Sequence, residues 1–210
     1  GPTASAVAPV LRVLAEANRG DGPLARMLDL DRIALGGHSG GGSVALHSAD
    51  RRYFPGVRAA FCYGAHTAAS TALGFEAGTI LPISAEMPFL LLGGSEDGVI
   101  VSSAVRYGTE SQPDTPIRRT FDEAIAGDRG DRYLGILRGA NHFTVVHPSD
   151  PTAGRAFLDR APLEDEDALR AVISTAVGNF LDAHLRLDPG APALLDECLR
   201  GPLVQIFERK

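Results

Sequence analysis

Short apolar runs alternate along the chain with longer segments in which apolar residues recur every three or four positions. The short runs predict β-strands, because a strand covered on both faces needs no polar alternation. They lie at residues 32–36, 57–63, 88–92 and 132–137. The longer segments predict helices at residues 7–17, 40–49, 115–126, 165–185 and 192–199 and a short helical turn at residues 23–30, with residues 64–86 irregular. Strands that alternate with helices indicate an α/β fold with a mainly parallel sheet flanked by helices.

Local signals support two of these helices. Thr115 is expected to cap helix 115–126, Pro116 occupies its first position, and Gly127 is expected to end it. Helix 165–185 has one apolar face, formed by Leu169, Val172, Ile173, Ala176, Val177, Phe180 and Leu181.

The size and charge of the chain restrict its class. At 210 residues it is long enough for one well-buried domain. A net charge of −6 without a basic stripe argues against nucleic acid as a partner. No apolar run approaches the roughly 20 residues that cross a bilayer, so we expect no membrane span. The sequence indicates no cellular compartment.

The cysteines and other potential ligands do not predict a cofactor. Cys62 and Cys198 lack metal-ligand spacing, and the apolar surroundings of Cys62 favour two free thiols over a bridge. No His, Cys, Asp or Glu cluster has convincing metal spacing. Glycines 40–42 lack the lysine of a phosphate-binding loop. We therefore expect neither a metal nor another cofactor.

The most specific motif is Gly37-His38-Ser39-Gly40-Gly41, which joins a predicted strand to a predicted helix. A serine between glycines at such a junction has the form of a nucleophile elbow. Large side chains two positions before or after the serine are expected to collide with neighbouring backbone. The turn exposes the Ser39 hydroxyl and leaves the Gly40 N–H at a helix N-terminus, where it can stabilise an oxyanion.

An acid and a histidine follow Ser39, each just beyond a predicted strand. Asp97 follows strand 88–92, and His142 follows strand 132–137. The carboxyl ends of parallel strands share one edge of a sheet, where sites form. In this arrangement His142 takes the proton from Ser39 and returns it to the leaving group, while Asp97 orients the imidazole.

Each of these residues also has a structural interpretation. Ser39 fits an ordinary helix N-cap, Asp97 fits a loop cap, and His142 fits a surface or core histidine. Glu96 is the rival acid, and we favour Asp97 because it lies three residues after Gly94. The shared order of the three signals favours a catalytic triad.

Two further histidines are candidates for substrate binding. His38 occupies the variable position of the elbow, and we expect it to point away from the partners of the nucleophile while packing near the pocket. His66 follows strand 57–63 and is expected to line the substrate cleft.

Together, the Gly-His-Ser-Gly-Gly elbow, segment 94–97 and Gly-Ala-Asn-His-Phe at 139–143 resemble the α/β-hydrolase superfamily. Within it, the chain looks most like the dienelactone hydrolase, chlorophyllase and polyester hydrolase (cutinase-like) group. Segment 31–35, Asp-Arg-Ile-Ala-Leu, and the lack of a large cap insertion between Tyr63 and Pro88 carry this closer resemblance. The resemblance implies an α/β-hydrolase fold and a small-molecule or polymeric ester as substrate.

The chain departs from this superfamily at its beginning. Members have several strands before the nucleophile strand, and a loop there gives the second oxyanion N–H. Here Ser39 lies too near the start of the sequence for these elements to precede it. About three parallel strands would leave one edge of the sheet unpaired. We expect residues 1–210 to be the C-terminal portion of a single α/β-hydrolase domain, completed by a missing N-terminal segment or a second polypeptide. The chain alone is then an incomplete catalyst.

The leading hypothesis is a serine hydrolase that cleaves carboxylic esters through an acyl-enzyme on Ser39. An amidase, a peptidase or an acyltransferase would use the same triad, and the sequence does not separate these. The alternative from another class is a non-catalytic binding or scaffold protein with a relict elbow.

Overall fold

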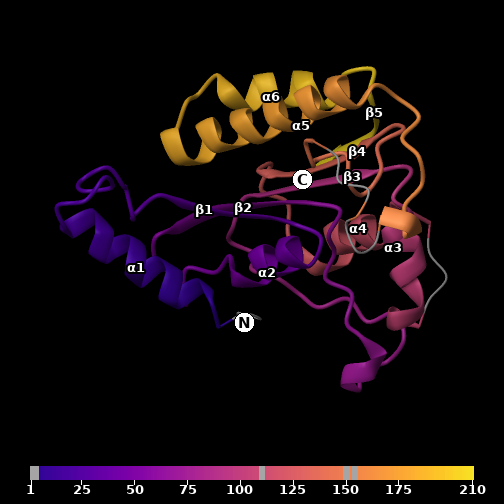
Figure 1. Cartoon of the computed structure of the whole chain (residues 1–210), viewed down its shortest axis with the longest axis horizontal. Coiled ribbons are helices and arrows are strands. Elements are labelled where there is room, and N and C mark those ends of the chain that lie inside the picture. The colour runs from indigo at the N-terminus through magenta and orange to yellow at the C-terminus, as the bar shows by residue number, and fades with distance from the viewer. Residues whose placement is uncertain (1–4, 109–111, 149–151, 153–155) are drawn as a thin grey trace.

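The computed structural model describes residues 5–108, 112–148, 152 and 156–210. A five-stranded sheet lies between two groups of helices (Figure 1). Its strands are β1 (Ile33–His38), β2 (Val57–Tyr63), β3 (Phe89–Gly94), β4 (Arg132–Leu137) and β5 (Val204–Arg209), in that spatial order. Strands β1 to β4 are parallel and β5 is antiparallel to β4. The predicted α/β fold with a mainly parallel sheet is confirmed.

The helices form the outer two layers. Helices α1 (Val7–Arg19), α2 (Gly40–Ser48) and α4 (Thr115–Arg119) pack on one side of the sheet, and α5 (Glu166–Leu181) and α6 (Ala191–Leu199) on the other (Figure 1). Helix α3 (Gly98–Ser103) follows the carboxyl end of β3. Short 3₁₀ turns are η1 (Thr71–Leu73), η2 (Ala104–Tyr107) and η4 (Ala156–Leu158). Single π-helical turns are η3 (Thr120–Ala124) and η5 (Asp182–Arg186).

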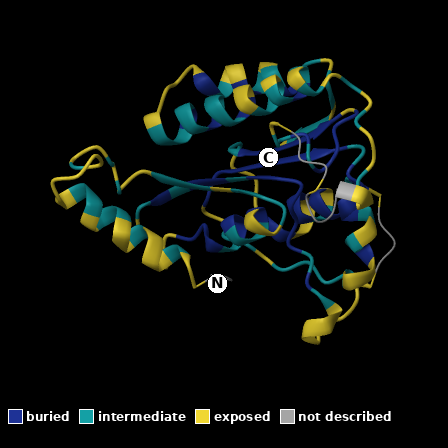
Figure 2. Cartoon of the chain, in the orientation of Figure 1, coloured by how far each residue is buried: buried dark blue, intermediate teal, exposed yellow. Residues whose placement is uncertain are grey.

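The centre of the sheet is the best-buried part of the molecule (Figure 2). Because successive strand residues face opposite sides, β3 supplies both cores. Phe89 packs with the α2 residue Leu46 on one side, and Leu90 packs with the α5 residue Phe180 on the other. This two-sided burial explains why the runs in β3 and β4 lack polar alternation.

The sequence-based strand count was too low. Among the described residues, all four strands predicted from the apolar runs are present and parallel, so only the count of about three parallel strands was too low, and the antiparallel β5 was not predicted. Strand β1 lies at one edge, and no described strand pairs with its outer side. The expectation that strands from outside residues 1–210 continue the sheet there stays a prediction.

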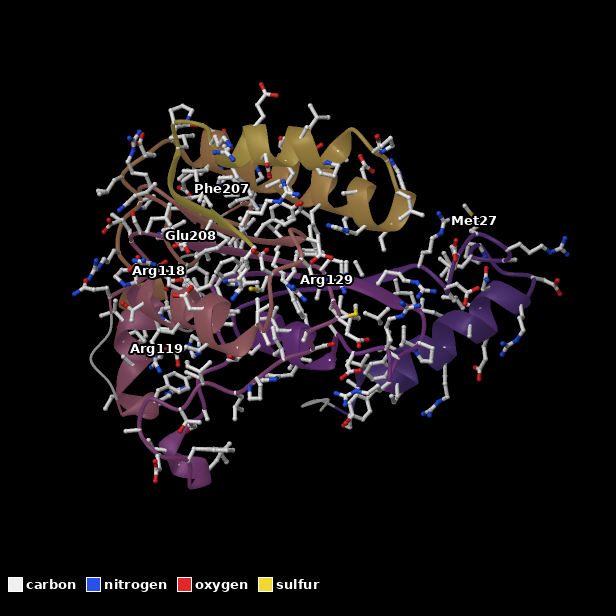
Figure 3. The ribbon with its side chains drawn as sticks, turned by 180° about the vertical axis from the view of Figure 1, so that it is seen from behind. Met27, Arg118, Arg119, Arg129, Phe207 and Glu208 are labelled. Carbon is white, nitrogen blue, oxygen red and sulfur yellow. The ribbon has the colours of Figure 1, made fainter. Side chains whose placement is uncertain are left out.

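Residues 23–30, predicted as a short helical turn, form hydrogen-bonded turns and no regular helix. The Asn18 amide donates to the Leu28 carbonyl and accepts from the Leu28 N–H, both at 3.0 Å. Arg26 has a φ of 58°, which no right-handed helix accommodates. Side-chain hydrogen bonds therefore satisfy backbone groups that a helix would otherwise pair. Met27 stands exposed on this segment (Figure 3).

The predicted helix 115–126 is divided in the structure. Asp114 rather than Thr115 is the N-cap, α4 ends at Arg119, and the π-helical η3 follows. The Thr120 hydroxyl donates to the Pro116 carbonyl at 2.9 Å. The Lys210 ammonium donates to the carbonyls of Phe121 (2.6 Å) and Ile125 (2.8 Å), so the C-terminal residue satisfies groups released at the end of this segment.

The last residues of β5 also lie near this segment. Arg118 of α4 lies 3.9 Å from the carboxylate of Glu208 in β5 (Figure 3). Both side chains are partly exposed, so the pair contributes little stability.

In the described ranges, no helix is both long and apolar enough to cross a membrane.

Candidate active site

Ser39 stands at the turn between β1 and α2 with a backbone conformation that side-chain-bearing residues seldom adopt. Its φ is 54° and its ψ is −128°. The Ser39 N–H donates to the Tyr63 carbonyl at 3.0 Å, and its carbonyl accepts from Gly42 at 2.9 Å and Ser43 at 3.1 Å. Such strain costs about 1–3 kcal/mol and persists only where the surroundings enforce it. The turn has the strained form expected of a nucleophile elbow.

The glycines around Ser39 have unequal roles. A Cβ on Gly37 would collide with the backbone of Gly41. A Cβ on Gly42 would lie 2.5 Å from the Cβ of Ala65 and 2.9 Å from that of Cys62. A Cβ on Gly41 would meet nothing within 4 Å. The collision predicted at Gly41, two residues after the serine, is therefore wrong. The glycine that allows α2 to pack closely on β2 is Gly42, three residues after the serine.

Asp97 and His142 form a buried pair. The His142 Nδ1 lies 2.7 Å from the Asp97 Oδ2, and the two residues are 2% and 1% exposed, respectively. A carboxylate only accepts, so Nδ1–H donates and Nε2 is left able to accept a proton. The other Asp97 oxygen accepts from the Ile100 N–H at 2.8 Å, which caps α3 and fixes the carboxylate.

Glu96 has a different environment from Asp97. Its carboxylate lies 3.5 Å from the Arg160 guanidinium and accepts from the Ser95 hydroxyl at 3.3 Å. The structure thus brings Asp97, and not Glu96, to His142.

Gly64, at the end of β2, leaves room for this pair. Its φ is +58°, and a Cβ there would lie 3.0 Å from the His142 Nδ1 and 3.1 Å from the Asp97 Oδ2. The preceding Tyr63 donates its hydroxyl to the Asn141 carbonyl at 2.6 Å. Burial raises the pKa of the Tyr63 hydroxyl, so this donor keeps its proton at neutral pH. The end of β2 therefore supports the loop that carries His142.

His38 does not lie as predicted. Its Nε2 is 2.9 Å from the His142 carbonyl, and the two ring centroids are 4.5 Å apart. The prediction that His38 points away from the partners of the nucleophile is wrong, because the ring packs on the backbone of His142. Burial lowers the pKa of His38, which favours the neutral ring with Nε2–H donating to the carbonyl.

A cavity of about 260 Å³ opens beside Ser39. His66 lines it, whereas His38 is not among its lining residues. Its other lining residues are Gly40, Ser43, Gly64, Ala65, Val99, Ile100, Ser103, Arg106 and Tyr107. A second cavity of about 290 Å³, at residues 50–52 and 83–87, contains none of the predicted site residues.

Ser39 and His142 are close but not hydrogen-bonded in this structure. The Ser39 N–H donates to the Tyr63 carbonyl, and a Cβ on the adjacent Gly64 would lie 3.0 Å from the His142 Nδ1, so the end of β2 adjoins both residues. Hydrogen bonds between nucleophile and base often tighten only when substrate binds. The exposed Gly40 lines the cavity at the start of α2, where its N–H faces the N-terminal end of the helix.

Asp159 is a site residue that the sequence did not reveal. Its Oδ1 accepts from the Gly98 N–H at 2.9 Å, and its Oδ2 accepts from the Phe143 N–H at 3.2 Å. Gly98 follows Asp97 and Phe143 follows His142, so one carboxylate joins the two loops that carry the pair. Burial raises the pKa of Asp159, with the nearby Asp97 adding to the effect.

We expect Asp159→Ala to lower kcat about tenfold and the free energy of unfolding by about 1–2 kcal/mol, because the Gly98 N–H loses its acceptor and the Phe143 N–H keeps only the Asn141 Oδ1 at 3.1 Å. Steady-state kinetics and urea denaturation measure the two effects. Asp167→Ala is the matched control, since Asp167 pairs with Arg170 on the surface and its side chain is 84% exposed. Equal effects of the two substitutions would contradict the role given to Asp159.

His66 predicts a pH dependence of stability. Burial lowers its pKa from 6.5 to about 4, and its Nδ1 accepts from the Ala68 N–H at 3.2 Å. As the pH falls below 6.5 the unfolded chain binds a proton at His66 while the folded protein does not, so stability falls between pH 6.5 and pH 4. We expect His66 to account for a loss of about 2 kcal/mol between pH 7.5 and pH 5.

The measurement compares denaturation of the wild type and His66→Asn at both pH values. Asparagine keeps an acceptor for Ala68 without titrating, so the variant is expected to lose less stability on acidification. The contributions of the remaining histidines are common to both proteins and cancel in the comparison. A parallel decline of the two proteins would show that His66 does not cause this loss.

The described part of the chain holds no group of three or more His, Cys, Asp or Glu residues suited to a metal ion. Cys62 and Cys198 are free thiols. They lie in cores on opposite sides of the sheet, and burial raises the pKa of Cys62 to about 12, so its thiol is not ionised at neutral pH.

A scan of the chain against protein-family models and a search of curated proteins both found no match.

Proposed function

We propose that the protein is a serine hydrolase that cleaves carboxylic esters, with the α/β-hydrolase fold. The observation that carries the proposal is the buried 2.7 Å contact between His142 and Asp97, beside a serine with strained backbone. A base oriented by a carboxylate next to a serine at an elbow is the arrangement that activates a hydroxyl nucleophile. In a non-catalytic protein with a relict elbow, no function would maintain a strained Ser39 together with a buried Asp97–His142 pair.

The proposed reaction has two half-reactions. The Ser39 Oγ attacks the ester carbonyl while the His142 Nε2 takes its proton, and the Gly40 N–H stabilises the resulting oxyanion. His142 then protonates the leaving alkoxide, and the acyl group stays on Ser39. Water, activated by the same nitrogen, releases the acid and restores the serine.

A second oxyanion donor is part of the proposal. Loss of one such donor costs about 10²–10³ in rate, so the Gly40 N–H alone supports slow turnover. We propose that the second N–H comes from a strand–loop block outside residues 1–210, on this chain or on a partner.

Covalent labelling tests the proposal. A fluorophosphonate is expected to label Ser39, and Ser39→Ala is expected to abolish both the labelling and the hydrolysis of 4-nitrophenyl butyrate. Ser43→Ala is the matched control, because Ser43 lines the same cavity but donates to the His66 carbonyl at 2.7 Å. Failure of Ser39 to react in any protein that contains this chain would contradict the proposal.

The ester class is tested separately from the nucleophile. We expect 4-nitrophenyl butyrate to be cleaved faster than the matching 4-nitroanilide, since the weakly basic 4-nitrophenoxide leaves more readily than an amide nitrogen. Faster cleavage of the anilide would favour an amidase or peptidase that uses the same residues.

A further inference from the structure

The peptide that joins His142 to Phe143 is hydrogen-bonded at both ends. Its carbonyl faces His38, the residue before Ser39, and its N–H faces Asp159. Asp159 in turn binds Gly98, the residue after Asp97. One peptide therefore connects the chain neighbours of all three candidate catalytic residues.

His38 binds the carbonyl end of this peptide. Its Nε2 lies 2.9 Å from the His142 carbonyl oxygen, and a carbonyl only accepts, so Nε2–H is the donor. The rings of His38 and His142 also pack together, with centroids 4.5 Å apart and planes inclined by 47°. The His38 ring lies 6.1 Å from that of Phe143. His38 therefore restricts both the backbone and the ring of His142.

Asp159 binds the N–H end. Its Oδ2 accepts from the Phe143 N–H at 3.2 Å, and its Oδ1 accepts from the Gly98 N–H at 2.9 Å. The Asn141 Oδ1 shares the Phe143 N–H at 3.1 Å. A carboxylate that accepts from the N–H polarises the peptide and makes its carbonyl a better acceptor, so the contacts at the two ends strengthen each other.

These contacts bear on the position of His142 relative to Ser39. Among the described residues, those that line the cavity beside Ser39 include neither His38 nor Asp159, so neither is placed to bind substrate there. The Ser39 backbone is fixed separately by its bond to the Tyr63 carbonyl. A shift of the peptide after His142 thus moves the imidazole while the serine stays in place. A misplacement of about 1 Å can cost about 10² in rate.

We infer that His38 and Asp159 are positioning residues that act as one unit, through the peptide between them, to hold His142 against Ser39 and Asp97. The inference rests on the proposed ester hydrolysis at Ser39. His38 fixes the peptide from the side of the nucleophile, and Asp159 fixes it from the loop of the acid. Loss of either contact frees the same peptide, so loss of both adds little.

A double-mutant cycle with 4-nitrophenyl butyrate tests this coupling. His38→Phe keeps a ring but removes the N–H, and Asp159→Ala removes the acceptor. Each is expected to lower kcat about tenfold. The double variant is expected to lose roughly ten- to thirtyfold rather than a hundredfold, because residues that act as a unit are not additive. KM should stay within about twofold, since neither side chain lines the cavity.

Rescue and an NMR resonance separate positioning from a general loss of structure. The amide of His38→Gln supplies an N–H for the carbonyl and is expected to recover most of the lost kcat. The His142 Nδ1–H, 2.7 Å from Asp97, is expected to give a low-field proton resonance that is absent from Asp97→Asn. This resonance should broaden in His38→Phe and in Asp159→Ala, where the imidazole gains mobility, and persist in His38→Gln.

The matched control is His47→Phe, because His47 is partly buried in the last turn of α2, at the end away from Ser39. It is expected to keep kcat and the resonance of the wild type. Urea denaturation identifies the folded variants, and His38→Leu replaces His38→Phe if the larger ring prevents folding.

The outcomes separate this inference from the proposed function. Multiplicative losses in the double variant, or equal losses in His38→Phe and His38→Gln, would overturn the inference alone while Ser39 is still labelled. Absence of Ser39 labelling and of all hydrolysis in the wild type would overturn the proposed function. The low-field resonance does not depend on turnover. If it is unchanged in both His38→Phe and Asp159→Ala, neither residue holds His142.

Discussion

Replacing Asp97 with asparagine is expected to lower kcat for ester hydrolysis by roughly 10⁴-fold, the loss that this change causes in a Ser-His-Asp triad. The Asp97 Oδ2 accepts from the His142 Nδ1 at 2.7 Å, which leaves Nε2 free to take the Ser39 proton. An amide NH₂ in that place donates to Nδ1 and moves the ring proton to Nε2. The ring can then no longer act as the base.

The experiment measures kcat and KM for 4-nitrophenyl butyrate, together with thermal unfolding. KM should change little, because Asp97 is buried and does not line the cavity beside Ser39. Glu96→Gln is the matched control, since Glu96 lies next to Asp97 in sequence but faces Arg160. If the two variants lose activity equally, Asp97 is not the residue that orients His142.

Replacing Gly64 with alanine is expected to lower kcat about 100-fold while leaving the protein folded. The added Cβ would lie 3.0 Å from the His142 Nδ1 and 3.1 Å from the Asp97 Oδ2, so the pair must shift. A misplacement of catalytic groups by about 1 Å can cost about 10² in rate. The φ of +58° adds about 1–2 kcal/mol of backbone strain to the loss.

Kinetics and urea denaturation separate the two effects of Gly64→Ala. Gly178→Ala serves as its control, because a Cβ on Gly178 in α5 meets nothing within 4 Å and alanine favours the helix. We expect the control to be at least as stable as the wild type and fully active. An active Gly64→Ala variant would show that the Asp97–His142 pair tolerates displacement.

The sequence predicted the parts of the site that have local signals. Ser39 lies between glycines at a strand–helix junction, and Asp97 and His142 each follow a buried strand, so their shared sheet edge follows from a parallel sheet. Asp159 and Gly64 had no such signal. Their roles depend on neighbours that lie 16 or more positions away in the sequence, and no local pattern encodes such contacts.

The contrast between local signals and long-range contacts also separates the strands and turns that were predicted from those that were missed. The cores of β2, β3 and β4 are apolar on both faces, so the strands were recognisable without neighbours. Strand β5 is only partly buried and contains Gln205, Glu208 and Arg209, so it is a strand because β4 pairs with it. Residues 23–30 form turns and no regular helix because the Asn18 side chain satisfies the backbone groups of Leu28.

By itself, the sequence determined the α/β layout, the position of the elbow and the order of the three candidate catalytic residues. These features depend on apolar periodicity and on glycine at a tight turn, which act within a few residues. Only the tertiary structure decided that Asp97 rather than Glu96 meets His142, that His38 packs on His142, and that Asp159 joins the loops of the pair. Those outcomes depend on which side chains face one another after the sheet assembles, and packing between distant segments sets them.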